Sequence, residues 1–312
     1  MNAATHERLA RLLVGAAAAI TIALLVTVVM GVAAPGAAHI TPSFLFTSPR
    51  SMGREGGIAA PLAATVLLLG VALAVAAPVG IGTAIWLTEY LRQRWLVAFI
   101  TFATESLAGV PSIVFGLFGF AVFVLRFRMG WSVWSGGLTL ALMILPTIVR
   151  TAQEALRAVP PGYREGALAL GATRWQALTR MLLPAAWPGI ATGMILSVGR
   201  AVGETAAVLL TAGSALGMPR HLGDPARSLA VHLYILAAEG ISLEKAYATG
   251  TVLIILIVLV NALANRLARP PRAGKERWPW SRRPSSNSKK SKSVTMTCRP
   301  SPASRSAFRA RR

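Results

Sequence analysis

The sequence predicts an all-α integral membrane protein with six transmembrane helices and a disordered basic C-terminal tail. Hydrophobic residues make up 54% of the 312 positions, and the mean hydropathy of +0.58 is too high for a soluble domain of this size. Several apolar runs approach the ~20 residues that cross a bilayer. Of the 32 Lys and Arg, fifteen lie in residues 266–312 with a single acidic residue. The chain therefore divides into an N-terminal region (1–57), a membrane core (58–268) and a tail (269–312).

The N-terminal region opens with an apolar run at 12–34, preceded by Arg8 and Arg11. This run is longer than the roughly 7 to 15 residues of a signal-peptide core, so we interpret it as an uncleaved transmembrane helix. The small residues at 36–38 leave a cleaved signal peptide as the alternative. A polar connection rich in Pro, Ser and Gly follows, and we expect it to form an outer loop.

The first half of the core has three apolar runs that predict spans: 61–87, 107–125 and 131–149. Pro78 should bend the far end of the first of these. Residues 89–104 combine arginines with aromatic side chains, a pattern typical of a helix in the membrane interface. Three glycines in the run at 107–125 favour close approach of a neighbouring helix: Gly109, Gly116 and Gly119.

A polar stretch, which we call the central loop (residues 163–184), separates the fourth and fifth apolar runs and reads YREGALALGATRWQALTRMLLP. Ala and Leu recur at helical spacing, Gly171 interrupts them and Pro184 ends the run. We therefore expect a helix, a break and a second short helix. A helix pair tethered to the membrane at both ends is suited to transmit movement between proteins. An ordinary basic connecting loop has the same composition, so composition alone leaves that alternative open.

The fifth apolar run, 187–210, contains Arg200 and Glu204, four positions apart. On a continuous helix they share one face inside the bilayer, where each charge costs roughly 2.5 to 3.5 kcal/mol on insertion scales. One interpretation is a self-neutralising pair that holds helices together. The other is that Arg200 binds a passing tetrahedral oxyanion with its guanidinium fork while Glu204 holds the arginine in place. Thr211 and Ser214 could add hydroxyls near the mouth of such a path.

The longest outer connection, 213–249, is nearly neutral and contains a short helical pattern at 228–238, which we expect to lie on the outer surface. The sixth apolar run is 250–267. Six spans put both termini on one side of the membrane. That side also carries the arginine-rich loops, so we predict that both termini and the central loop are cytoplasmic.

The tail is rich in Pro, Ser, Lys and Arg and has too few apolar residues to bury a core, so we expect it to be disordered. Attraction to anionic lipid headgroups is its simplest role. We expect no nucleic acid partner, because only Trp278 and Trp280 accompany the basic residues and no binding motif is present.

The central loop resembles the "EAA" motif of ABC importer permeases. The residues that keep the spacing of that motif are Glu165, Gly166, Ala167, Gly171, Met181, Leu183 and Pro184. Gly166 stands where the motif has Ala, and Met181 where it has Ile, and both changes keep the size or the apolar character. The strings SLAGVPSIVFGLFG, LPTIVRTAQEALRAVP and GRAVGETAAVLL are similar to the phosphate importer permeases of the PstA type. The resemblance extends over about residues 56–268.

This resemblance implies the MetI-like fold of type I ABC importer permeases. It implies that the central loop couples to an ATPase through Glu165, Gly166, Ala167, Gly171, Leu183 and Pro184. It also implies a substrate pathway that includes Arg200, Glu204 and Thr205. The expected function is import of inorganic phosphate across the bacterial cell membrane by alternating access.

The resemblance implies four partner chains of three kinds: a second permease (PstC-like), two ATPase subunits (PstB-like) and a periplasmic or extracellular phosphate-binding protein (PstS-like). This chain lacks the Gly-x-x-x-x-Gly-Lys-Ser/Thr loop that holds nucleotide phosphates, so we expect it to be no enzyme. We expect no cofactor and no metal on this chain, and ATP-Mg on the partner ATPases.

Other functions are compatible with parts of the sequence. The chain could be the partner permease of the same importer or a permease for another oxyanion, since a guanidinium does not distinguish phosphate from sulfate by charge. A membrane enzyme acting on lipid-linked substrates predicts clustered acids or histidines, whereas those present are scattered. A structural anchor predicts that removal of the tail abolishes function.

Overall fold

The computed structural model describes residues 3–267, and the regular elements of that range are helices. The α-helices are α1 (Ala3–Ala37), α2 (Pro42–Phe46), α3 (Ala59–Ile85), α4 (Arg94–Ala108), α5 (Ser112–Gly119), α6 (Val133–Arg157), α7 (Pro161–Ala169), α8 (Arg174–Ala177), α9 (Leu183–Val202), α10 (Ala206–Thr211), α11 (Leu229–Ala238) and α12 (Leu243–Leu267). A 3₁₀ turn, η1 (Ser51–Gly53), and three π-helical turns, η2 (Trp86–Tyr90), η3 (Phe120–Arg126) and η4 (Leu178–Leu182), complete the set. The predicted tail, 269–312, lies outside the described residues.

Five stretches of this range are long and apolar enough to cross a membrane as single helices: 10–37, 59–90, 133–157, 174–202 and 243–263. A sixth crossing results if α4 and the α5–η3 helix, which are bent by 99° relative to each other, count as one span. The all-helical membrane fold predicted from the sequence is therefore confirmed, with five to six candidate spans in the described residues.

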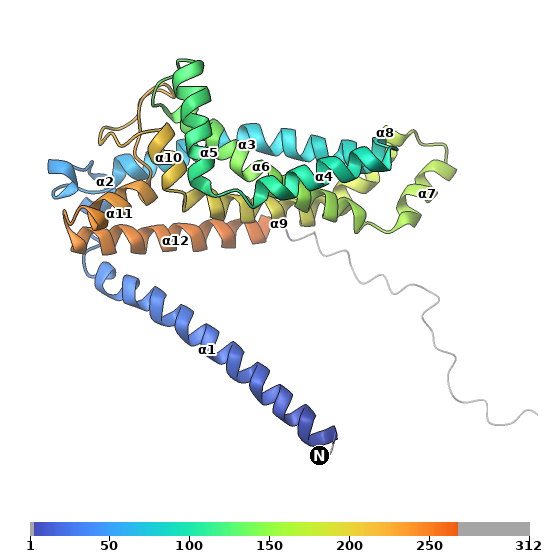
Figure 1. Ribbon diagram of the computed structural model, residues 1–312, viewed down its shortest axis with the longest axis horizontal. Coiled ribbons are helices and arrows are strands. Elements are labelled where there is room, and N and C mark those ends of the chain that lie inside the picture. Colours follow the sequence, from blue (N-terminus) through green and yellow to red (C-terminus); the bar gives the residue numbers. More distant parts are fainter. Residues whose placement is uncertain (1–2, 268–312) are drawn as a thin grey trace, which may run out of the picture. The chain divides into compact units, whose positions relative to one another are not determined.

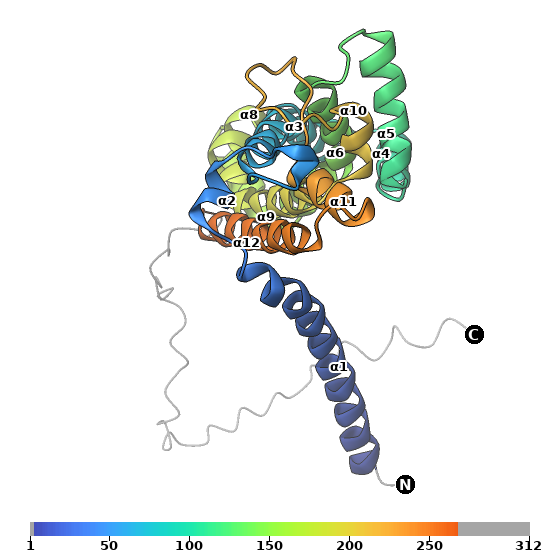
Figure 2. The same cartoon turned by 90° about the vertical axis from the view of Figure 1, so that its left-hand side faces the viewer.

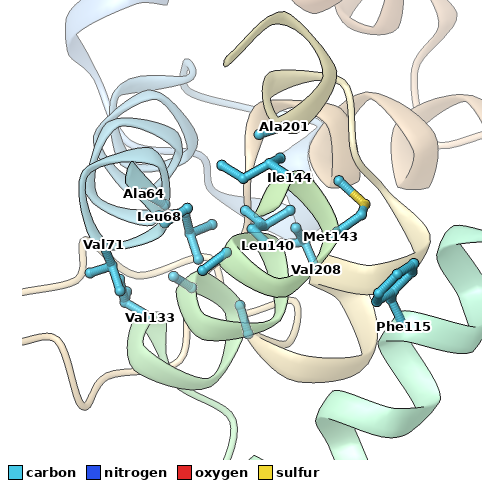
Figure 3. Packing of buried hydrophobic residues seen from close by; sticks show 14 of the residues in the cluster. Ala64, Leu68, Val71, Phe115, Val133, Leu140, Met143, Ile144, Ala201 and Val208 are labelled. Carbon is cyan, nitrogen blue, oxygen red and sulfur yellow. The ribbon is translucent and has the colours of Figure 1, made fainter. Parts of the chain in front are cut away.

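Helices α3, α6 and α9 lie side by side at the centre of the bundle (Figures 1 and 2). Their facing sides bury Leu68 and Val71 of α3, Leu140 and Ile144 of α6, and Ala201 of α9 (Figure 3). In lipid there is no hydrophobic drive between helices, so close packing of small and branched side chains has to hold them together. The helix break at Gly203 and the central loop, described below, are connected to this packed centre.

Two of the three glycines predicted to permit close approach do so. A Cβ on Gly116 would lie only 2.9 Å from the Cα of Ala207 in α10, and one on Gly119 would collide with the Thr139 side chain in α6. Gly109 instead ends α4 and has its nearest neighbour in its own helix, so the prediction for this glycine was wrong.

The third apolar run has a bend near its start, whereas the sequence predicted a span at 107–125 that is separate from the helix at 89–104. Helix α4 continues to Ala108 and α5 begins at Ser112, with the 99° bend between them. Pro111 explains the break, because proline lacks an N–H and disfavours helical backbone in the residue before it. The aromatic side chains of α4 are exposed, Trp95 by 69%, and α4 lies alongside α6 (Figure 1).

Helix α1 packs against α12 near its own C-terminal end. The Thr251 hydroxyl donates a hydrogen bond of 3.3 Å to the Val32 carbonyl, and Gly36 lies against the backbone of Tyr247. The most apolar part of α1 buries none of its residues within the described chain. In Figures 1 and 2 it extends away from the other helices. That surface is therefore open to lipid or to a companion chain.

Helix α11 forms where the sequence predicted it, and one of its faces is buried against the bundle. Leu229, Val231 and Leu236 are fully buried, and the N–H of Leu229 donates 2.9 Å to the hydroxyl of Thr65 in α3. The other face is exposed, with Tyr234 at 53%.

Candidate functional site

The central loop begins with α7 and a tight turn. Pro161 occupies the first turn of α7, where a missing N–H costs little. The helix ends in a Schellman motif: the N–H of Gly171 donates 3.0 Å to the Leu168 carbonyl, and that of Ala172 donates 3.1 Å to the Ala167 carbonyl. Gly171 has a φ of 81°, which side-chain-bearing residues rarely adopt. The structure thus has the helix break that the sequence predicted at this glycine.

The second helix of the loop begins with a capping box. The Thr173 hydroxyl accepts from the Gln176 N–H at 3.3 Å, and the Gln176 side chain accepts from the Thr173 N–H at 2.9 Å. Helices α8, η4 and α9 then follow without interruption to Val202. The prediction that Pro184 ends this helix was wrong. The π-turn η4 precedes Leu183 and changes the hydrogen-bond register, so Pro184 lies in the first turn of α9, where proline is tolerated.

The exposed side of the central loop carries one carboxylate and large apolar side chains beside its arginines. Glu165 is exposed and is absent from the four ion pairs of residues 3–267. Leu170 is 89% exposed and Trp175 63%. Gly166 has open space where a Cβ would lie, so the alanine of the motif would fit, whereas Ala167 is buried. The loop therefore presents a free carboxylate and two large apolar side chains.

An ion pair joins the central loop to the end of α3. Arg164 of α7 donates from Nη2 to Oε1 of Glu89 in η2. The Glu89 side chain is only 12% exposed, and both residues line a hollow of about 300 Å³ together with Arg92 and Arg174. Sequence analysis missed the pair because its partners are 75 positions apart. The available signals were an acid at the end of an apolar run and an arginine beside Glu165.

The fifth apolar run is broken at Gly203, where α9 ends, and α10 begins at Ala206. Arg200 and Glu204 therefore do not share one face of a continuous helix, and that prediction was wrong. The N–H of Glu204 turns back to a carbonyl three residues earlier, at 3.3 Å. Glycine weakens a helix interior by about 1 kcal/mol relative to alanine, which makes Gly203 the natural place for this break.

Arg200 is exposed and forms no ion pair of 4.0 Å or less within the described residues, so the self-neutralising pair is not formed with Glu204. Thr205 makes no capping hydrogen bond for α10. Thr205 lines an open groove of about 510 Å³ together with residues of α11 and α12, among them Tyr234 and Leu253. The break thus leaves a guanidinium and a hydroxyl without the partners that a regular helix would provide.

The two further hydroxyls proposed for this path differ in accessibility. Thr211 is fully buried and donates 2.6 Å to a carbonyl of its own helix, so its expected role near the mouth is wrong. Ser214 is exposed, and its carbonyl accepts 2.9 Å from Nε of the buried Arg227.

Arg227 also contacts His232 of α11, with 3.4 Å between Nη1 and Nδ1. Both side chains are almost completely buried, at 3% and 1% exposure. Burial, with the positive charges of Arg227 and Lys245 nearby, lowers the pKa of His232 to about 4. The imidazole is therefore neutral at physiological pH and can accept from the guanidinium.

Solved structures with this arrangement of helices are importers. A bacterial alginate ABC transporter bound to its periplasmic protein matches 85% of this chain and 95% of its own chain, with a TM-score of 0.63 and 16% identity. The MetNI methionine ABC transporter matches 68% and 93%, with a TM-score of 0.54 and 21% identity. The fold is thus that of the MetI-like membrane subunits of ABC importers.

The chain belongs to the family of binding-protein-dependent transport system inner membrane components, whose model matches residues 76–271. It is therefore a multi-pass inner membrane protein and a non-catalytic subunit of an importer that works with ATPases and a binding protein.

Relatives of the chain include several permeases. The probable ABC transporter permease YqgI of Bacillus subtilis is 33% identical over 85% of this chain and 96% of its own. The phosphate transport permease PstA of Yersinia pestis is 36% identical over 72% and 76%. The phosphate transport permease PstC of Haemophilus influenzae is 34% identical over 56% and 63%.

Proposed function

We propose that this chain is a PstA-type permease that carries inorganic phosphate across the bacterial cytoplasmic membrane by alternating access. Arg200, Glu204 and Thr205 line the substrate pathway. One observation carries the proposal: Arg200 is an exposed guanidinium without a carboxylate partner among the described residues, less than one turn before the helix break at Gly203. The similarity to PstA proteins supports phosphate as the anion.

The pathway residues have complementary tasks. The Arg200 guanidinium offers parallel N–H donors that match two oxygens of a tetrahedral anion. Glu204 stays close enough to attract Arg200 without forming a contact ion pair, which limits how tightly an anion is held. Non-helical backbone at membrane depth is tolerated where it lines a water-filled cavity, so the break at Gly203 fits a pathway.

The central loop is the proposed docking site for an ATPase subunit on the cytoplasmic side. Glu165, Leu170 and Trp175 would contact the ATPase, while Gly166, Ala167, Gly171, Leu183 and Pro184 shape the loop. We propose that two PstB-like ATPases, a PstC-like second permease and a PstS-like binding protein complete the importer. ATP-Mg would bind to the ATPases, and their closure would move α7 and α9 together.

The second candidate is the partner permease of the same importer, which the 34% identity to a PstC protein favours. In that case the chain would line the pathway in the same way, but it would occupy the PstC position of the pseudo-twofold pore instead of the PstA position. Co-purification with tagged permeases distinguishes the two candidates. A PstA-type chain should co-purify with a tagged PstC-like permease, and a PstC-type chain with a tagged PstA-like permease.

The test of phosphate transport is uptake into proteoliposomes that contain the co-purified importer, ATP and the binding protein. Radioactive phosphate should accumulate and sulfate should not. Arg200→Ala should lower the initial rate at least about tenfold, because hydrogen bonds to charged groups contribute roughly 1.5 to 3 kcal/mol. Arg200→Lys should recover only part of the rate, since an ammonium lacks the bidentate fork.

Arg126→Ala is the matched control, because it also removes one exposed arginine from the end of a helix. Its uptake should equal that of the wild type. Normal phosphate uptake by Arg200→Ala would remove Arg200 from the pathway, and faster uptake of sulfate than of phosphate would assign the importer to another oxyanion.

A further inference from the structure

The Glu89–Arg164 pair adds a polar link between η2 and α7 to the apolar packing of α3 on α6 and α9. The central loop is bonded covalently to α6 at one end and continues into α9 at the other. Glu89 lies 75 positions before Arg164, in η2, which continues directly from the end of α3. In this π-type turn the N–H of Leu91 donates a hydrogen bond of 3.0 Å to the Trp86 carbonyl. Such turns place side chains that a regular helix would direct elsewhere.

The pair is more than a surface contact. Glu89 is nearly buried, and Arg164 is partly covered, with its Nε atom buried and without a hydrogen-bond partner in the described structure. A carboxylate in that position needs its cation, since loss of one partner leaves the other charge desolvated and unpaired. Most exposed ion pairs lack this property and contribute little.

We infer that the Glu89–Arg164 ion pair is the joint through which movement of the central loop reaches α3. This inference rests on the proposed coupling role of the loop. Arg164 lies directly before Glu165, so an ATPase that grips the loop moves Arg164 with it. The pair then pulls the end of α3, whose other turns pack against α6 in the bundle core. Glu89 and Arg164 are positioning residues, and neither touches the transported anion.

Without the pair, the loop could still move α9 directly, because α8, η4 and α9 form one continuous stretch. Helix α3 would then follow α9 less closely, through the apolar cluster that includes Ala84, Leu183 and Ala186. The inference therefore predicts partial uncoupling: the complex assembles and hydrolyses ATP, but less of that hydrolysis moves substrate.

The direct test measures the distance between α7 and α3 in the complete importer in nanodiscs. Spin labels are attached to Gly162→Cys and Gly82→Cys, two glycines with open space around them, in a Cys298→Ser background. With the pair intact, the distance distribution should be narrow and unchanged between the nucleotide-free state and the ATP–vanadate state. In Glu89→Gln or Arg164→Gln it should broaden and depend on nucleotide.

The functional readout is substrate transported per ATP hydrolysed. Each single variant should lower this ratio about fivefold or more, the usual lower range for coupling between sites. The charge-reversed double variant Glu89→Arg with Arg164→Glu should restore a substantial part of it, which a double-mutant cycle quantifies. Arg92→Gln, which removes a guanidinium of the same hollow that forms no ion pair in the described residues, should change neither readout.

Three results would overturn the inference. The α7–α3 distance could change with nucleotide in the wild type, or stay narrow and constant in the single variants. Alternatively, the single variants could fail to assemble, without recovery in the reversed pair, which would give the pair a role in folding alone. If the wild-type importer moves no phosphate, the proposed function fails, but the distance measurement still decides the role of the joint.

Discussion

At Gly171 the backbone has a φ of 81°, and nothing lies within 4 Å of the place where a Cβ would be. A larger side chain would therefore fit, and lack of room does not explain the glycine at this position. The reason is conformation, because a left-handed residue other than glycine costs roughly 1 to 2 kcal/mol. The spacing of the motif identified this glycine, and the break it makes was predicted from the sequence.

Gly171→Val should lower ATPase binding, because a β-branched residue at this φ deforms the turn that joins α7 to α8. Retention of the ATPase subunits on the tagged permease, measured after washing, should fall severalfold. Gly162→Val, in α7 one residue before the loop, also adds a side chain in open space, but without a positive φ, and it should retain the ATPases. Equal retention by both variants would show that the turn geometry is irrelevant to docking.

His232 predicts that the stability of the region around α11 depends on pH. Its pKa is lowered to about 4 in the folded protein, against 6.5 in the unfolded chain, so the unfolded state binds more protons between these values. Stability should therefore be lost as the pH falls from 6.5 towards 4, by on the order of 3 kcal/mol at pH 4. Thermal unfolding in nanodiscs should show this slope, and His232→Gln should reduce it. His221→Gln, at an exposed histidine, should leave the slope unchanged.

At the scale of helices, the apolar runs predicted which segments cross the membrane, but they did not predict where helices break. Gly203 and Pro111 interrupt runs whose hydropathy is continuous, whereas Pro184 lies in a helix that continues through it. Hydropathy averages over a turn or more, so it does not detect local hydrogen-bond geometry. The Glu89–Arg164 pair could not be predicted from the sequence, because the two residues are far apart in the chain and are brought together only by the fold.

The contact between α5 and α10 should be intolerant of added volume. Gly116→Leu would drive a side chain into the backbone of Ala207, and overpacking of this kind typically costs 1 to 3 kcal/mol. The unfolding temperature of the purified importer should therefore fall by several degrees. Gly70→Leu adds the same side chain to α3 where nothing lies within 4 Å, and it should leave that temperature unchanged. A similar temperature for both variants would contradict the close packing of α5 on α10.

At the scale of the whole molecule, the sequence predicts that the central loop is cytoplasmic and that residue 217 is outside. In a Cys298→Ser background, Leu170→Cys should react with a membrane-impermeant maleimide in inverted vesicles but not in intact cells or spheroplasts. Gly217→Cys should show the opposite pattern in spheroplasts. Labelling of Leu170→Cys from outside would place the loop where no ATPase could reach it, and the proposed coupling mechanism would be lost.

The architecture of the central loop has a consequence for how the importer assembles. Its Schellman turn and its capping box are both made by the loop's own residues, so the docking surface is shaped before any partner arrives. Association then loses little conformational entropy, and most of the contact energy is available for affinity. An ATPase that dissociates should bind the same preformed central loop again. The rate at which ATPases exchange between membrane subunits should therefore be limited by diffusional encounter and not by refolding of the permease.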